Sequence, residues 1–285
     1  MNHYGKVFDN GFEKNQTLIS AIDYNNDPPW GGFPFDRKDF VKIRDGSDRL
    51  PQSFADYLAE QIHLSTPVES IEQNADGVIV RVSGGTEFNA DRALCTVPLP
   101  VLNRIQFTPS LSDEKIEAIS GGYNYAPSTR VFMQFANRFW ESDGLNGWGN
   151  TDWPEEIWHP TWDREGPKGI LMSYMYYGRA AELDQLIEED RIQQVLNRFD
   201  NVFPGAYDHL ESGVSHSWAL QEWSGGAWAS PTGAQDEALA AHIGAAEGRI
   251  HFAGEHASDN HGWMQGALVS GLRAATEIHS GDLYL

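Results

Sequence analysis

The chain has 285 residues, of which 40% are hydrophobic and 21% are charged, so it can bury one large core or two modest ones. Its 41 acidic and 20 basic residues give a formal charge of −21, which argues against nucleic acid and anionic membranes as partners because both attract basic surfaces. The single cysteine, Cys95, excludes an internal disulfide, and the chain shows no signal-peptide pattern and no run of 18 apolar residues, so we expect a cytoplasmic protein.

Taken in chain order, the elements mix helices and strands after an irregular start over residues 1–40. Helices are expected where apolar residues recur at helical spacing. These segments are residues 45–62, 111–119, 179–199, 235–246 and a last helix from about Gly262. Strands are expected where apolar and polar residues alternate or where a short apolar run lies between turn residues. These segments are residues 63–73, 76–85, 92–99, 129–135, 168–178 and 249–254.

This order of elements predicts a mixed α/β (α+β) fold. Strands lie near both ends of the chain, and a different set of strands and helices lies between them. We therefore expect two interleaved domains, with the first and last segments pairing in one sheet.

The stretch FAGEHASDNHGWMQGALVSGLRAATEI, residues 252–278, carries the most specific information. A short strand ends at Gly254, and Glu255 then lies at the carboxyl end of the strand, where open α/β sheets place their ligands. The helix after Gly262 offers unpaired N–H groups and the positive end of its dipole. Glycine within a helix costs about 1 kcal/mol against alanine, so the small residues of this helix suggest close approach of a flat ligand or of another helix. They are Gly266, Ala267, Gly271, Ala274 and Ala275.

Periodicity alone leaves a second interpretation open, in which this helix is packed tightly on a sheet with Trp263 as a core anchor. The order of the residues favours a ligand site. FAGEHAS, then GWMQGA, then SGLRAA resembles the C-terminal flavin-binding segment of flavin-dependent amine oxidases, the family of monoamine oxidases, polyamine oxidases and L-amino acid oxidases. Further segments within residues 40–285 resemble the same family, whereas residues 1–40 stay unplaced.

The resemblance implies a partial FAD-binding domain of the glutathione-reductase-like Rossmann type. It would be discontinuous, formed by residues 41–110 and 223–285, and would lack the N-terminal βαβ unit. Residues 111–222 would form a mixed-sheet substrate-binding domain.

By the same resemblance, FAD would be held through Val68 at the adenine and through Gly254 and Glu255 at the ribose or ribityl side. Gly262, Trp263, Met264 and Ala267 would lie along the isoalloxazine ring. Ala227 stands where monoamine oxidases carry the cysteine that attaches the cofactor, so the flavin should be bound without a covalent link.

For catalysis, the resemblance places Trp228 and Trp263 on either side of the substrate amine. Tyr174 resembles the tyrosine that hydrogen-bonds a substrate carboxylate in L-amino acid oxidases, although it could equally be an ordinary strand aromatic. The implied reaction is FAD-dependent oxidation of an amine or L-amino acid. It comprises hydride transfer from the amine-bearing carbon to flavin N5, hydrolysis of the imine, and passage of the electrons to O2 with release of hydrogen peroxide.

Two departures from the family pattern stand out. Arg130 occupies the position of a lysine that holds a water near flavin N5, and arginine could instead pair bidentately with a carboxylate, which hints at an acid substrate. The pyrophosphate-binding G-x-G-x-x-G turn is absent from the sequence. We therefore expect either a second chain that supplies the missing segment, or a homo-oligomer, or a truncated fragment or inactive remnant of such an enzyme.

Rival chemistries find less support in the sequence. His256, Asp259 and His261 share one loop and could ligate a metal, but they offer only three donors, and we expect no metal. The chain has no G-x-S-x-G for a serine hydrolase, and nothing places two carboxylates together as in a glycosidase. The alternative outside enzymes is a non-catalytic flavin-binding or scaffolding subunit.

Overall fold

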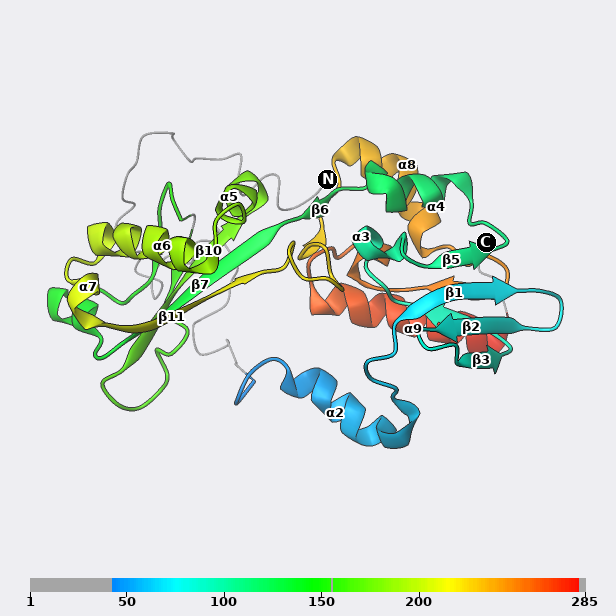
Figure 1. Ribbon diagram of the computed structural model, residues 1–285, viewed down its shortest axis with the longest axis horizontal. Helices are drawn as coiled ribbons and strands as arrows, with labels where there is room; N and C mark the ends of the chain where they lie inside the picture. Colours follow the sequence, from blue (N-terminus) through cyan, green and yellow to red (C-terminus); the bar gives the residue numbers. More distant parts are fainter. Residues whose placement is uncertain (1–42, 155, 282–285) are drawn as a thin grey trace.

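The protein folds into two lobes that are joined by long strands (Figure 1). The structure, a computed structural model, describes residues 43–154 and 156–281, so the irregular segment expected at 1–40 lies outside the described residues. The fold mixes α and β elements, as predicted. Among the helices of the described part, none combines the length and the apolar composition of a membrane span.

The first lobe contains three small sheets. The four-stranded sheet has the order β3-β2-β1-β5 and is formed by β1 (Val68–Gln73), β2 (Val78–Val82), β3 (Glu87–Ala90) and β5 (Gln106–Thr108). The two-stranded sheets pair β4 (Ala93–Cys95) with β13 (Ile250–Phe252), and β6 (Tyr125–Ala126) with β12 (Trp228–Ala229). Because β13 lies parallel to β4, the expected pairing of the first and last segments in one sheet is confirmed.

Helices surround these sheets. They are α3 (Leu99–Leu102), α4 (Asp113–Glu117), the π-helical turn η3 (Ala118–Gly122), α8 (Gly233–Gly244), the 3-10 turn η5 (Glu255–Ala257) and α9 (Met264–Ser280). A capping box starts α8, because the Thr232 hydroxyl accepts from the Gln235 N–H while the Gln235 side chain accepts from the Thr232 N–H. Leu111, Ala118 and Tyr123, which fall in the segment expected to form the substrate-binding domain (residues 111–222), pack into the core of this first lobe. The domain boundaries expected from the sequence stay a prediction.

The second lobe is built on a five-stranded antiparallel sheet of order β11-β7-β10-β9-β8. Its strands are β7 (Ser128–Phe135), β8 (Gly149–Asn150), β9 (Glu156–Trp158), β10 (Gly169–Tyr176) and β11 (Leu210–Ser217), and its helices are η4 (Phe139–Asp143), α5 (Tyr177–Leu183), α6 (Glu188–Val202) and α7 (Ala206–His209). Alternate residues of β7 and β10 point into a core with α5, α6 and α7, as the alternation of residues 129–135 predicts. Figure 1 shows these helices on one side of the sheet.

One predicted helix is wrong in its extent. Residues 179–199 were expected to form a single helix, but α5 ends at Leu183 and α6 starts at Glu188. The Asp184 carboxylate accepts hydrogen bonds from Thr129 Oγ1 (2.6 Å) and Ser217 Oγ (2.7 Å), which tie the break to the sheet. This contact between distant residues cannot be read from local periodicity.

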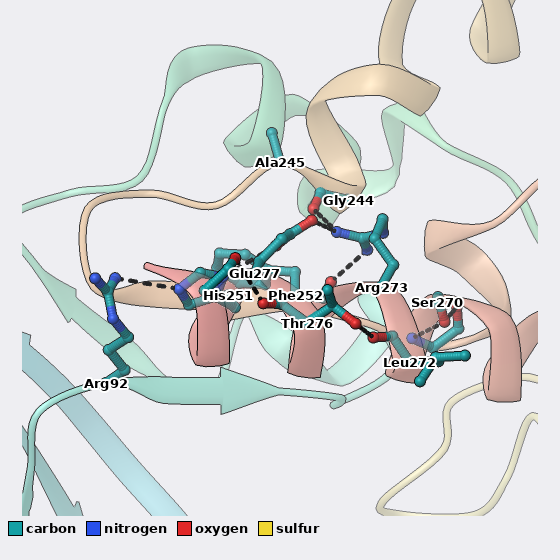
Figure 2. A network of polar contacts seen from close by, with 12 residues as sticks. Arg92, Gly244, Ala245, His251, Phe252, Ser270, Leu272, Arg273, Thr276 and Glu277 are labelled. Atoms are coloured by element: carbon teal, nitrogen blue, oxygen red, sulfur yellow. Dashed lines mark hydrogen bonds and ion pairs between the residues drawn. The ribbon is translucent and has the colours of Figure 1, made fainter. Parts of the chain in front are cut away.

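The last helix, α9, is anchored to β13 by a buried polar network (Figure 2). The His251 ring is fully buried and lies between Glu277 Oε2, 3.0 Å from Nδ1, and Arg92 Nη1, 3.4 Å from Nε2. A neutral ring that carries its proton on Nδ1 satisfies both contacts. Arg273 donates to Glu277 (2.7 Å) and to the Phe252 carbonyl (2.7 Å). These bonds hold α9 to β13 and give the buried polar groups hydrogen-bond partners.

The helix α2 (Arg49–Leu58) lies apart from both lobes in Figure 1. Its predicted position and the place of Pro51 in the first turn are confirmed, but none of its residues is buried. Phe54 is 54% exposed and Tyr57 is 87% exposed. The described residues therefore leave the apolar side of α2 uncovered.

Candidate functional site

Glu255 follows β13 and holds three segments of the chain together. Its Oε1 accepts hydrogen bonds from the Tyr125 hydroxyl (2.7 Å) and the Ala229 N–H (3.0 Å), and its Oε2 accepts one from the Gly262 N–H (2.7 Å). Burial, together with the charge of Glu255, raises the pKa of Tyr125. The carboxylate therefore connects β6, β12 and the approach to α9, and a further lone pair remains for a ligand hydroxyl.

The glycine before it is required by the protein itself. Gly254 has φ +138°, and a Cβ there would lie 2.3 Å from Cε1 of the His256 ring. Its N–H donates to Ser270 Oγ (3.0 Å), which fastens the loop to α9. Burial lowers the pKa of His256 to about 4, so this ring is neutral near pH 7 and serves as packing beneath the loop.

The approach to α9 is extended. The helix starts at Met264, two residues after the position expected, because Trp263 is extended (φ −121°, ψ 140°). Gly262 has φ +76°, and its Cα faces the Trp228 ring, with a Cβ there 3.3 Å from Cγ of the indole. No side chain caps the helix, and the side chains of Trp263 and Met264 are 52% and 58% exposed, so its amino end is open.

The small residues of α9 do not share one face. Gly266 and Ala274 are buried, and a Cβ at Gly266 would lie 2.3 Å from the Asn260 carbonyl oxygen. In contrast, Ala267 and Ala275 point outward, and a Cβ at Gly271 would meet nothing within 4 Å. The small residues were expected to allow close approach of a ligand or of another helix. Those on the inner side allow close approach of the chain itself, and those on the outer side leave an uncovered surface.

A continuous chain of aromatic rings leads from the second lobe to this region. Successive rings lie 5.3 to 6.4 Å apart between centroids, most of them edge to face, a favourable geometry for aromatic pairs. In order the rings belong to Trp148, Trp158, Tyr174, Tyr176, Tyr177 and Trp228. Because Trp228 also faces Gly262, the chain connects the five-stranded sheet to the start of α9.

Arg130 meets the third ring of this chain, that of Tyr174. They are opposite each other on β7 and β10, and the Arg130 guanidinium carbon lies 4.0 Å from the centre of the Tyr174 ring. This is cation–π distance. Glu156 of β9 is the next residue in the same row of the sheet, opposite Tyr174, and burial raises its pKa.

The structure therefore brings the predicted residues into two groups. Gly262 donates to Glu255 and faces the Trp228 ring, and Trp263 and Met264 follow directly in the chain. Arg130 and Tyr174 form the second group. Val68 begins β1 and packs, half-buried, against the first core, and Ala267 lies exposed one turn into α9. Their roles toward FAD stay predictions.

The metal alternative finds no support in the described part of the chain, where no three metal-ligating side chains come together. His256 is turned under Gly254. His261 lies 3.0 Å from the Tyr123 hydroxyl through Nε2 and 3.0 Å from the Glu255 carbonyl oxygen through Nδ1, so both of its nitrogens are used within the protein.

Several residues of the site were missed by sequence reasoning. Tyr125 bonds the Glu255 carboxylate, Tyr176 and Tyr177 complete the aromatic chain, and His216 lies opposite Arg130. The aromatic run MYY after Tyr174 was the one available signal. The other contacts depend on strand register between distant segments, which a single sequence does not contain.

Comparison with known proteins identifies the family. The family described as "Flavin containing amine oxidoreductase" matches residues 1–279, and the chain belongs to this family. The match includes residues 1–40, which sequence analysis left unplaced. Flavin is the cofactor that defines the family, in agreement with the predicted FAD.

Individual relatives point the same way. The chain is 32% identical over 259 residues to an L-amino-acid oxidase of Siganus canaliculatus, covering 87% of this chain and 49% of the relative. It is 29% identical to the flavin-dependent L-tryptophan oxidase RebO of Lentzea aerocolonigenes, covering 85% and 53%. A structure of putrescine oxidase bound to putrescine shares the fold, with a TM-score of 0.74 at 23% identity, over 82% of this chain and 53% of that one. The chain thus spans about half the length of the relatives it matches.

Proposed function

We propose that the chain forms the substrate-facing part of an FAD-dependent oxidase of L-amino acids or related amines. The observation that carries this proposal is the junction at Glu255, where one carboxylate holds β6, β12 and the open amino end of α9 beside Trp228. The residues that follow are exposed and are not covered by described side chains, so a flat ring has access to this surface. The arrangement fits a flavin.

Each side chain has a definite task in this proposal. The uncapped N–H groups at the start of α9 would hold a carbonyl oxygen of the ring, and the remaining lone pair of Glu255 would accept from a hydroxyl of the cofactor. Trp228 and Trp263 would orient the amine and exclude water around it. The chemistry that a bound flavin supplies is oxidation of the carbon bearing the amine, with dioxygen as the acceptor and hydrogen peroxide as the second product.

The exposed apolar surfaces support completion by a further segment. On the outer side of α9, Leu268, Val269 and Leu272 are 50%, 47% and 72% exposed, and α2 has no buried residue. Surfaces of this kind mark interaction sites. We propose that a segment carrying the pyrophosphate-binding turn, of the kind that belongs to the remaining half of the family's length, covers them. A second copy of this chain is the competing occupant, which the oligomeric state in gel filtration would reveal.

The deciding experiment is flavin retention. The chain is purified alone and after co-expression with the half of an L-amino-acid oxidase relative that it does not match, and the visible flavin absorbance is recorded after gel filtration with added FAD. A band in either preparation supports the proposal, and its appearance only after co-expression supports completion by a partner. Absence of the band from both would favour a non-catalytic or inactive protein.

In any flavin-loaded assembly, Trp263→Ala should lower kcat/KM for the amine substrate by about tenfold or more, because an exposed aromatic wall of the site is lost. Stability should change little, because the side chain is 52% exposed. Trp162→Ala is the matched control, since Trp162 is 40% exposed on the second lobe. Unchanged turnover in Trp263→Ala would remove this residue from the pocket.

A further inference from the structure

Tyr177 has a backbone conformation that its residue type rarely adopts. It begins α5 directly after β10 and has φ +53°, in the left-handed region that favours glycine. The other described residues that combine a side chain with a positive φ all precede β1, and they are Asp45, Ala59 and Ser65. Within the two lobes, Tyr177 is therefore the one described residue with a side chain that is held in this conformation.

Burial of the side chain does not account for this strained backbone. The side chain of Tyr177 is 46% exposed, so the removal of its apolar surface from water offsets only part of the cost. Backbone strain of this kind persists only where the surrounding structure fixes the conformation, and it is concentrated at functional sites. One such constraint is the hydrogen bond from the Tyr177 N–H to the Pro127 carbonyl (3.0 Å), and the others come from the side chain.

The side chain of Tyr177 extends from the second lobe to the first. Its hydroxyl oxygen lies 2.9 Å from Oγ of Ser230, the residue directly after β12. Its ring lies edge to face against the indole of Trp228 in β12, with 6.4 Å between the centroids and 73° between the planes. These two contacts connect the start of α5 to the short strand whose Ala229 N–H donates to Glu255.

Trp228 depends on such neighbours for its orientation. Its side chain is only half-buried, and Gly262 faces the base of the indole, where a Cβ would lie 3.3 Å from Cγ. A partly exposed side chain keeps one orientation when the residues that touch it are themselves fixed by packing and hydrogen bonds. Tyr177 is a neighbour of this kind, because Pro127 holds its backbone and Ser230 contacts its hydroxyl.

We propose that Tyr177 is a positioning residue, which fixes the orientation of Trp228 beside the amino end of α9 from across the boundary between the lobes. The strained backbone is retained because it carries the ring and the hydroxyl of Tyr177 to β12. The effect on a substrate amine rests on the proposed function, whereas the positioning of Trp228 does not. Relief of the strain should therefore stabilise the fold and loosen the site at the same time.

Two substitutions separate the strain from the contacts. Tyr177→Ala and Tyr177→Gly both remove the ring and the hydroxyl, but only alanine keeps a Cβ that the left-handed backbone disfavours. In an ordinary helical position alanine is the more stabilising of the two residues. Here we expect the reverse order, with the thermal midpoint of Tyr177→Gly a few degrees above that of Tyr177→Ala. An equal or higher midpoint for Tyr177→Ala would overturn the strain on which the proposal depends.

The positioning is measured on Trp228 in the full chain, labelled with fluorotryptophan. Its fluorine NMR resonance is the one that Trp228→Phe removes. We expect one narrow line in the wild type, and a line that broadens or splits in Tyr177→Gly because the indole then takes more than one orientation. Tyr177→Phe and Ser230→Ala, which each remove one side of the hydroxyl contact, should cause a smaller broadening. A change of chemical shift alone does not count, because loss of the neighbouring ring changes the shift of a fixed indole.

Tyr207→Phe is the matched control. Tyr207 is 47% exposed, its hydroxyl is hydrogen-bonded to Gln193 and Asn197, and it lies on α7, far from the first lobe (Figure 1). This variant should leave the Trp228 line unchanged. An unchanged line width in Tyr177→Gly, or equal broadening in Tyr207→Phe, would overturn the positioning role.

Circular dichroism of each variant establishes that it is folded, and Tyr177→Phe provides the readout if Tyr177→Gly is not. In a flavin-loaded assembly, Tyr177→Gly should lower kcat/KM about tenfold, mainly through kcat, with the flavin absorbance per chain unchanged. Unchanged turnover beside a broadened line would remove the effect on the substrate. The two proposals fail separately: a broadened line without flavin retention supports the positioning and removes the oxidase, and flavin retention with an unchanged line does the reverse.

Discussion

The two faces of β7 differ in how deeply their side chains are buried, and so do the two faces of α9. On β7, Val131, Met133 and Phe135 are fully buried against helices, whereas Arg130 and Phe132, which alternate with them, are only partly covered. On α9, the inner positions are small or polar and closely packed, and the outer ones are apolar and exposed. One element thus provides stability on one side and a surface for recognition on the other. Substitutions on the two faces should therefore separate stability from binding.

The largest contrast is expected within β7. Phe135→Ala removes a fully buried ring and should lower the free energy of unfolding by about 3–5 kcal/mol. Phe132→Ala, three residues earlier and half-buried on the open face, should cost clearly less. Denaturant unfolding of both variants measures the difference. Similar losses would mean that the open face is a second core and not a binding surface.

A contrast of opposite sign is expected within α9. Gly266→Ala places a methyl group 2.3 Å from the Asn260 carbonyl oxygen and should cost about 1–3 kcal/mol through overpacking. Gly271→Ala meets nothing within 4 Å and should stabilise the helix by up to about 1 kcal/mol. The thermal midpoint of each variant gives the sign. A stabilising Gly266→Ala would show that the loop before α9 is not closely packed on it.

The smallest effect concerns pH and the inner side of α9. Burial acts to raise the pKa of Glu277, but hydrogen bonds from His251 and Arg273 outweigh it and hold the pKa below its ordinary value of 4.5. A lowered carboxyl pKa contributes stability that is fully present above 4.5 and is lost as the pH falls through the lower, folded-state value. The stability advantage of the wild type over Glu277→Gln should therefore shrink on acidification below pH 4.5.

Unfolding measured at neutral pH and at pH values below 4.5 gives this difference. Glu237→Gln, on the exposed side of α8, serves as the control and should show no such dependence. An advantage that grows on acidification would contradict the role assigned to the network.

What the sequence could predict followed from local patterns. The alternation in residues 129–135 placed the inner face of β7 correctly, and the expected pairing of the first and last segments is found as β13 against β4. The break at Asp184 was missed because its cause is a pair of hydrogen bonds from two other strands. His216 was missed for the same reason, since only the register of β11 against β7 places it beside Arg130.

Glu255 shows how far a family pattern alone can reach. The sequence indicated a carboxylate at the end of a strand that would face a ligand. The structure adds that three protein donors already occupy much of its capacity, from Tyr125, Ala229 and Gly262. Its contribution to holding the site together was not visible in the sequence, because its partners lie up to 130 residues away.

This separation has a consequence for synthesis. The Tyr125 hydroxyl and the Ala229 amide leave the ribosome before the acceptor that they share, and Gly262 follows later still. A nascent chain can complete the second lobe while β6 and β12 still lack the carboxylate that joins them to α9. A translation product that stops before Glu255 would lack the junction that holds β12, and limited proteolysis of such a product should cleave near Trp228.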